Sequence, residues 1–247
     1  MRRLLRELSV ALAVAEKDIK VYYAKPSSIM FGFLFPLSMF LSYIVGRGIG
    51  VDKAISVLVA QTLLFASSSI GSVTIPMERR VKTFDRFLTA PVTLHSILMG
   101  KTLAGLLYGA AVSIIPVGIG LIAGMRVASP SELAVGIVLS SATFSCMGVM
   151  FASIPTQSPG QVMMPLNFVR IPLLFISGVF IPIEKLPLWG RTLAAASPLS
   201  YSMDLVRAGI EGSKYFGASV SILGLIAYLI IFLMVSIRFH IMIQKRE

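Results

Sequence analysis

Long stretches without a charged residue recur along this chain, and they restrict its possible folds more than any other feature. Residues 54–77 and 102–125 are two such stretches, and each is long enough to cross a lipid bilayer as a single helix. The mean hydropathy is +0.86. Only 13% of the residues are charged, whereas a typical soluble domain contains about 25%. The sequence therefore predicts an all-α integral membrane protein.

The uncharged stretches predict six transmembrane helices. Residues 133–168 are too long for a single crossing, and two prolines and a glycine within residues 154–160 divide them in two. Pro36 lies inside the first predicted helix and is expected to kink it. Because apolar stretches alternate with polar segments throughout, residues 1–247 are interpreted as one membrane domain without a soluble appendage. The predicted spans are residues 29–46, 54–75, 102–125, 133–154, 162–181 and 218–237.

Residues 1–28 are not a span and are predicted to form an amphipathic helix in the membrane interface. Basic side chains lie on the other faces of this helix, outside its apolar stripe. A soluble helix packed on a partner is the alternative. The residues of the apolar stripe recur every three or four positions and are Leu8, Leu12, Ala15, Ile19 and Tyr22.

A second polar segment, residues 182–217, lies between the fifth and sixth predicted spans. It is expected to form short helices on the outer side of the membrane. Trp189 suits a membrane interface, and Arg207 precedes Glu211 by four positions, as in a helix.

The distribution of basic residues predicts the orientation. Six spans place both termini on one side of the membrane, and the segments on that side carry 14 of the 22 Lys and Arg residues, against 7 on the opposite side. Since cytoplasmic segments retain basic residues, both termini and the loop after the second span are expected in the cytoplasm of a multi-pass protein of the cell membrane. The net charge of +11 is attributed to these loops, and no nucleic-acid partner is inferred.

A charged segment lies between the second and third predicted spans. Within it, Val81, Phe84 and Leu88 recur at intervals of three and four residues, which predicts a short amphipathic helix on the membrane surface. Glu78 precedes Lys82 by four positions, which is the favoured order for an acidic and a basic residue on one helix. A solvated loop with incidental charges is the alternative.

Small and hydroxyl-bearing residues occur inside the predicted spans. The second span carries several Ser and Thr residues, for which helix packing is favoured over a substrate role. Two motifs in the third span, Gly105-x-x-x-Gly109 and Gly120-x-x-x-Gly124, would let helix backbones approach closely.

The fifth predicted span contains Asn167 and Arg170. Placing a charged residue in the middle of a span costs about 2.5 kcal/mol or more, so such a residue is expected to have a functional or structural partner. Arg170 and Asn167 are therefore candidates for the substrate pathway. A salt bridge or carbonyl contacts at a helix interface are the alternative for Arg170.

The sequence does not favour catalysis. Gly100-Lys101-Thr102 resembles the end of a phosphate-binding loop, but His95 stands where that motif needs a glycine. Both histidines fall outside the predicted spans, no Cys/His cluster indicates a metal site, and no paired carboxylates occur in a span. Neither an enzyme nor a metal site is expected.

Two stretches of the chain together carry a family resemblance. The first comprises Glu78-Arg79-Arg80, Phe87-Leu88-Thr89-Ala90-Pro91 and Gly100-Lys101. The second comprises Ser177-Gly178-Val179-Phe180-Ile181-Pro182, Leu186-Pro187-Leu188-Trp189 and Ser197-Pro198-Leu199-Ser200-Tyr201, ending at Arg207. In these stretches, and in the order of its segments, the chain resembles the membrane subunit of ABC type-2 transporters, the permease family of drug, polysaccharide and lipid exporters.

The resemblance implies the permease subunit of an ATP-driven exporter of an amphipathic or hydrophobic substrate. Two permease subunits, identical or different, would pair with two ABC ATPase subunits that bind the ATP and Mg²⁺, so no cofactor is expected in this chain. The segment between spans two and three would be the coupling helix that docks on the ATPase. A channel or scaffold outside this family is the alternative. The coupling residues would be Glu78, Val81, Phe84, Asp85 and Leu88.

The sequence departs from the family pattern at two positions. A glycine is usual in the coupling segment where Lys82 stands, which concerns the local turn geometry. An apolar or small residue is usual near Arg170, which concerns the lining of the pathway.

Overall fold

The protein is helical in the part of the chain that the structure describes. The structure is a computed structural model and describes residues 2–23, 26–45, 48–83 and 92–244, among which no strand occurs. The longer helices are α1 (Arg2–Tyr22), α3 (Phe35–Ile44), α4 (Val51–Arg80), α6 (Leu94–Ile122), α7 (Pro130–Phe151), α8 (Pro159–Ile176), α10 (Pro198–Glu211) and α11 (Ala218–Gln244). The shorter ones are α2 (Pro26–Ile29), the π-helical turn η1 (Met30–Leu34), the 3₁₀ turn η2 (Ile183–Lys185) and α9 (Leu188–Ala195).

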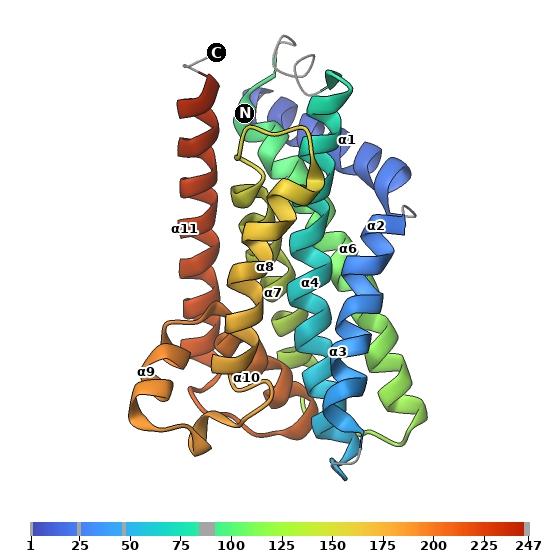
Figure 1. The fold of residues 1–247 in the computed structure, drawn as a ribbon, viewed down its shortest axis with the longest axis vertical. Coiled ribbons are helices and arrows are strands. Elements are labelled where there is room, and N and C mark those ends of the chain that lie inside the picture. The colour runs from blue at the N-terminus through green and yellow to red at the C-terminus, as the bar shows by residue number, and fades with distance from the viewer. Residues whose placement is uncertain (1, 24–25, 46–47, 84–91, 245–247) are drawn as a thin grey trace.

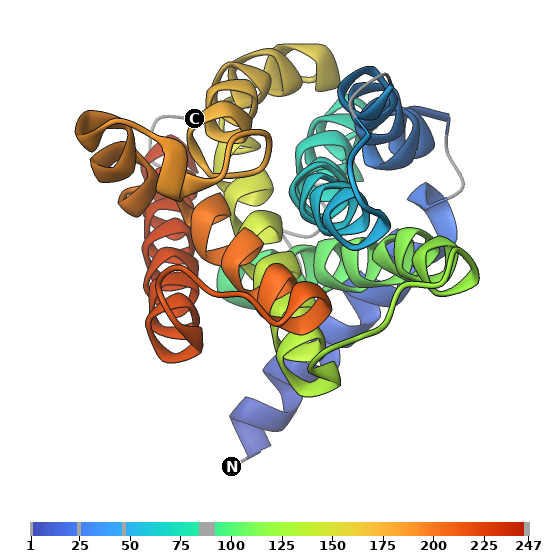
Figure 2. The ribbon, with the colours of Figure 1, turned by 90° about the horizontal axis from the view of Figure 1, so that it is seen from below.

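The long helices form a bundle, and α1 lies across one end of it (Figure 1). The last turn of α4, the first turn of α6 and the C-terminal end of α11 lie at this same end, which we call the α1 end. Helices α9 and α10 lie at the opposite end, and Figure 2 shows α1 extending beyond the other helices toward its N-terminus. The predicted N-terminal helix is therefore present, and it lies transverse to the bundle.

Among the residues that the structure describes, four helices are long and apolar enough to cross a membrane, namely α4, α6, α7 and residues Ala218–His240 of α11. These helices confirm an all-α membrane protein. The helix boundaries differ from those of the predicted spans, and two of the differences have a visible cause. Helix α6 begins at Leu94 and not at residue 102, because the Thr93 hydroxyl accepts a hydrogen bond from the Ser96 amide at 3.3 Å and caps the helix. Helix α8 ends at Ile176 and not at residue 181, because the chain turns at Gly178 with φ +76°.

The segment predicted as the first span consists of α2, η1 and α3 in direct succession. The turn before Pro36 is π-helical, and the amide of Phe35 donates to the carbonyl of Met30. A proline ring clashes with the carbonyl four residues before it, and a wider turn relieves that clash. The predicted distortion at Pro36 thus takes the form of a widened turn.

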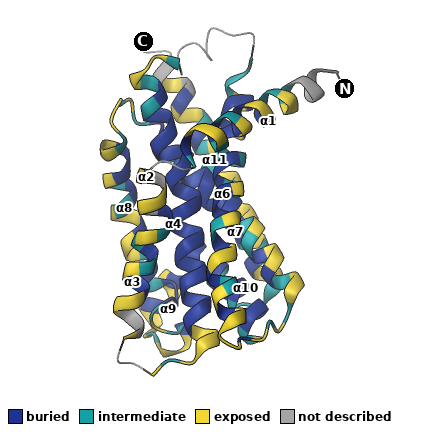
Figure 3. Cartoon of the chain, turned by 90° about the vertical axis from the view of Figure 1, so that its right-hand side faces the viewer, coloured by how far each residue is buried: buried dark blue, intermediate teal, exposed yellow. Residues whose placement is uncertain are grey.

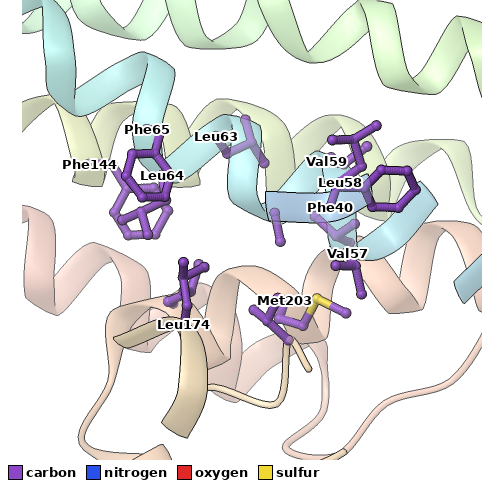
Figure 4. Packing of buried hydrophobic residues seen from close by; sticks show 14 of the residues in the cluster. Phe40, Val57, Leu58, Val59, Leu63, Leu64, Phe65, Phe144, Leu174 and Met203 are labelled. Carbon is purple, nitrogen blue, oxygen red and sulfur yellow. The ribbon is translucent and has the colours of Figure 1, made fainter. Parts of the chain in front are cut away.

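Helix α4 is the centre of the bundle. Every residue in its most apolar 18-residue window is buried by the rest of the chain, compared with 17% of that window in α11 (Figure 3). Its side chains Leu58 and Phe65 pack in one cluster with Phe40, Phe144 and Leu174 from other helices (Figure 4). Because lipid is as apolar as these side chains, tight packing rather than removal from water holds them together.

One of the two predicted glycine motifs brings helices together. A Cβ on Gly105 would lie 2.7 Å from the Ser67 carbonyl oxygen, and one on Gly109 would lie 2.9 Å from Ser67 Cβ, so α4 needs both glycines for its approach to α6. In the second motif, Gly120-x-x-x-Gly124, the two glycines do not both lie at a close helix contact. Gly124 has nothing within 4 Å and ends α6 with φ +90°.

The segment between α8 and α11 folds as the predicted short helices. The Ser177 and Ser197 hydroxyls lie 2.6 Å apart and join the end of α8 to the start of α10. In α10, Arg207 Nε lies 3.5 Å from Glu211 Oε2, which confirms the expected spacing of that pair on one helix. The contact between Ser177 and Ser197 links α10 to α8 at the end opposite α1.

Candidate functional site

Four charged side chains meet inside the α1 end of the bundle, and we call them the ion cluster. Lys101 Nζ lies 3.0 and 2.9 Å from the two carboxylate oxygens of Asp18 and 2.6 Å from Glu78 Oε1. Lys17 Nζ lies 2.8 Å from Asp18 Oδ1 and also contacts Glu78 Oε1. The side chains of Lys101 and Asp18 are 0% exposed and that of Glu78 is 1% exposed, whereas Lys17 is 33% exposed. The cluster therefore joins α1 to α4 and α6.

Close packing of α1 on α6 positions the ion cluster. A Cβ on Gly100 would lie 2.6 Å from the Ala11 carbonyl oxygen and 2.7 Å from Val14 Cβ, so only glycine permits this approach. Directly after α1, the Tyr23 hydroxyl donates to the Ala104 carbonyl at 2.6 Å. Asp18 is consequently held beside Lys101, which directly follows Gly100 in α6.

The α1 face that packs on the bundle differs in part from the predicted stripe. Leu8 and Leu12 are 53% and 59% exposed. The residues that face the bundle are spaced three and four apart and include an acidic one, because Lys101 and Glu78 provide a polar site beneath this face. They are Ala11, Val14, Ala15, Asp18 and Tyr22.

The ion cluster is balanced in formal charge, with two cations and two carboxylates. Burying such a group brings little net stability compared with an apolar core, but removing one member leaves an uncompensated charge. Burial lowers the pKa of the Lys17 ammonium to about 8, and the nearby charge of Lys101 acts in the same direction, whereas Asp18 opposes it. The cluster thus ties three helices together in one specific arrangement.

The coupling candidates Glu78 and Val81 lie at the end of α4, next to a break in the helix. Helix α4 runs on through Pro76 to Arg80, and Lys82 adopts a left-handed conformation with φ +55°. The two residues expected on one helix, Glu78 and Lys82, are thus separated by this break, and Glu78 turns into the ion cluster. Val81 is 62% exposed beside the break. This conformation explains why the family usually has glycine where this chain has Lys82, because glycine adopts a positive φ without a steric penalty.

Three of the predicted coupling residues, Phe84, Asp85 and Leu88, lie outside the described residues. Their role stays a prediction from their spacing in the sequence. The described chain resumes at Val92, directly before α6.

The two pathway candidates lie together in α8, at the contact with α4. Arg170 is fully buried, and its Nη2 donates to Ser68 Oγ at 2.6 Å and to Ser69 Oγ at 3.3 Å. Its Nη1 donates to Asn167 Oδ1 at 3.2 Å, and its guanidinium carbon lies 5.1 Å from the centre of the Phe65 ring. Within the described residues these partners are all neutral. The serines of the second span therefore serve both helix packing and the binding of a buried arginine.

Sequence reasoning missed Asp18 and the partners of Lys101. The sequence around Lys101 indicates only the end of a phosphate-binding motif and the end of the coupling segment. The available signal was the position of Asp18, seven residues after Ala11 and four after Val14, on the face with the smallest residues of α1. An acidic residue on a packed face needs a buried cation, and Lys101 at the start of a span needs an anion.

Comparison with known proteins places this arrangement in a family. The family model described as "ABC-2 type transporter" matches residues 10–210, from α1 to α10. The chain belongs to this family. It is therefore a membrane permease of the ABC-2 type.

Relatives of this ABC-2 permease include proteins from several bacteria. It is 30% identical over 141 residues to the "Daunorubicin resistance ABC transporter permease protein DrrB1" of Streptomyces coeruleorubidus, a match that covers 54% of this chain and 48% of that protein. It is 26% identical over 218 residues to "Nodulation protein J" of Rhizobium leguminosarum bv. viciae, which covers 83% and 80% of the two chains. It is 22% identical over 153 residues to the "Probable multidrug ABC transporter permease YbhR" of Escherichia coli (strain K12), which covers 61% and 41%. The chain thus spans about half the length of the first and third of these relatives.

Proposed function

We propose that this permease is the transmembrane subunit of an ATP-driven exporter in the cell membrane. In this proposal the chain crosses the membrane six times, with both termini and the α1 end in the cytoplasm. Two permease subunits, identical or different, assemble with two ABC ATPase subunits that bind ATP and Mg²⁺. The substrate is amphipathic or hydrophobic, such as a drug, a lipid or a glycan-linked lipid, and it passes near Asn167 and Arg170.

The ion cluster is the observation that best supports a coupling role. The predicted coupling segment connects α4 to α6, and the cluster fastens these same two helices to α1 through Glu78, Lys101 and Asp18. A force applied to the segment between the helices would therefore act on three helices at once. Coupling through a contiguous packed network of this kind is how motion at a docking site can reach distant helices.

The coupling proposal is tested with Phe84→Ser/Leu88→Ser, a double variant of two residues four positions apart. Full burial of one such side chain is worth about 1.5–3 kcal/mol, and each 1.4 kcal/mol corresponds to about tenfold in affinity. We expect the affinity for the ATPase to fall by about one to two orders of magnitude while membrane insertion is unchanged. Co-purification of the ATPase with the permease and substrate-stimulated ATP hydrolysis measure the effect.

The matched control is Arg86→Ala, which changes a charged residue between the two apolar positions. This control is expected to retain most of the ATPase binding. A normally inserted Phe84→Ser/Leu88→Ser protein that binds the ATPase and transports at the parental rate would exclude this segment as the coupling element.

A further inference from the structure

A cavity of about 720 Å³ opens beside the ion cluster at the α1 end of the bundle. Its wall is formed by the second half of α1, the end of α4 with the residues after it, and the first residue of α8. This volume is within the range of sites that bind small molecules. The lining residues are Lys17, Val21, Tyr22, Met77, Arg80, Val81, Thr83 and Pro159.

The charges that reach this cavity are positive. Lys17 and Arg80 line it, and within the described chain no acidic side chain is among its lining residues. The nearest carboxylates, those of Asp18 and Glu78, are at most 1% exposed and are bound to lysines inside the ion cluster. An anion in the cavity would therefore meet cations without facing the carboxylates of the cluster directly.

The remainder of the wall is apolar. Val21, Met77, Val81 and Pro159 provide hydrocarbon surface next to the two cations. The cavity also lies at the level where α4 ends and α6 begins, which is the end of two helices with the length and composition of membrane spans. A ligand with an anionic head and a hydrocarbon chain matches both features, and an anionic phospholipid is present at high local concentration in such a position.

We propose that the cavity between α1, α4 and α8 binds one anionic phospholipid, with its phosphate at Lys17 and Arg80 and an acyl chain along Val21 and Met77. The bound lipid touches α1 and the end of α4 together. It therefore reinforces the same contact that the ion cluster makes between these two elements. The proposal depends on the membrane location of the protein and not on the transported substrate.

Quenching of a tryptophan by brominated lipids tests the proposal. The full chain with Trp189→Phe and Val21→Trp carries its one tryptophan at the cavity, and it is reconstituted in phosphatidylcholine vesicles that contain brominated phosphatidylglycerol or brominated phosphatidylcholine. We expect stronger quenching by the brominated phosphatidylglycerol at equal mole fraction. In the parental chain, the native Trp189 lies in α9 at the opposite end, is 68% exposed and should report no preference.

Two further substitutions separate the cavity from general surface charge. Removing one basic residue near a membrane surface corresponds to about a fivefold loss of preference for the anionic lipid, so Arg80→Gln should lower the preference at the Val21→Trp reporter by about this factor. Lys20→Gln is the matched control, because Lys20 is an exposed residue of α1 that pairs with Glu16 and does not line the cavity.

Several outcomes would overturn the assignment. Equal quenching by the two lipids at the cavity reporter would show that no anionic lipid is selected. An equal loss of preference in Arg80→Gln and Lys20→Gln would assign the effect to the membrane surface. Loss of the preference on addition of inorganic phosphate would assign the cavity to a free anion, and its loss on addition of the partner ATPase would assign the cavity to that protein.

Discussion

At the scale of single residues, the ion cluster is the most constrained feature of this permease. Lys101 is fully buried and contacts both Asp18 and Glu78, while Lys17 contacts the same two carboxylates from the side of the solvent. Each lysine thus bridges two acids that belong to different helices. The arrangement makes the four residues dependent on one another, so single and paired substitutions should differ in their effects.

Lys101→Met should lower the free energy of unfolding by about 3–5 kcal/mol, because it leaves two buried carboxylates with one lysine. Asp18→Asn/Lys101→Met restores the balance of charges and should be more stable than Lys101→Met alone. Thermal unfolding of the purified variants in detergent measures both effects. Lys20→Gln, which removes an exposed pair with Glu16, is the control and should change stability by less than about 1 kcal/mol. If the effects of Asp18→Asn and Lys101→Met simply add, the residues are not coupled.

Lys82 offers a second test at this scale. It is the one residue other than glycine with positive φ in the described chain, and its conformation costs an ordinary residue about 1–2 kcal/mol. Lys82→Gly should therefore stabilise the end of α4, whereas the β-branched Lys82→Val should destabilise it. Hydrogen exchange of the amides from Met77 to Val81 measures the effect. Slower exchange in Lys82→Val than in Lys82→Gly would contradict the assigned turn.

At the scale of helices, the approach of α1 to α6 depends on a missing side chain. Gly100 lies against the backbone of Ala11, and the contact places Asp18 over Lys101. Helix α1 is therefore joined to the bundle by packing as well as by charge. A helix that was bound only to the lipid headgroups would not need this close contact.

Gly100→Ala should push α1 away from α6 and weaken the ion cluster, because the new Cβ would lie 2.6 Å from a backbone carbonyl that cannot turn aside. Gly118→Ala is the matched control in the same helix, since a Cβ there meets nothing within 4 Å. Hydrogen exchange across α1 should become faster in the first variant and stay the same in the second. Unchanged exchange in both would mean that the packing at Gly100 does not hold α1.

Most of the helices could be predicted from the sequence. The features that could not be predicted are contacts between distant residues, and each has a physical cause. Uncharged runs and periodicity are local signals, so the bundle helices and α1 were anticipated. Glu78 was assigned to a pair with Lys82, because spacing along one helix cannot reveal that Lys101, 23 residues later, competes for the same carboxylate. The break at Lys82 was visible only as a departure from the usual glycine. Two neutral partners of Arg170, Ser68 and Ser69, come from α4, about a hundred positions earlier, and no local sequence pattern predicts them.

At the scale of the whole molecule, the two ends of the bundle are chemically different. The α1 end carries the ion cluster and a cavity lined by cations, whereas the opposite end carries α9 and α10 with the exposed Trp189. Basic residues are retained in the cytoplasm, so this difference agrees with an α1 end that faces the cytoplasm.

The orientation is tested by labelling in intact cells, in a Cys146→Ala background that has no other thiol. Ser131→Cys, in the first turn of α7, should react with an impermeant thiol reagent because it lies at the end opposite α1. Gln157→Cys, in the connection from α7 to α8, should react only after the membrane is permeabilised. The reverse pattern would invert the assigned topology, and equal labelling at both positions would exclude the alternating arrangement.

The complete enclosure of α4 has a consequence for the order in which the protein is assembled. Helix α4 is synthesised before α6, α7, α8 and α10, which later cover it. It is therefore first exposed to lipid without these neighbours. Ser68 and Ser69 tolerate that interval because they donate their hydroxyl protons to the carbonyls of Leu64 and Phe65, in their own helix. Their lone pairs stay free to accept Arg170 once α8 has been made. Ser68 and Ser69 are thus hydrogen-bonded within α4 when it is made, and they gain Arg170 as a further partner after α8 has been synthesised.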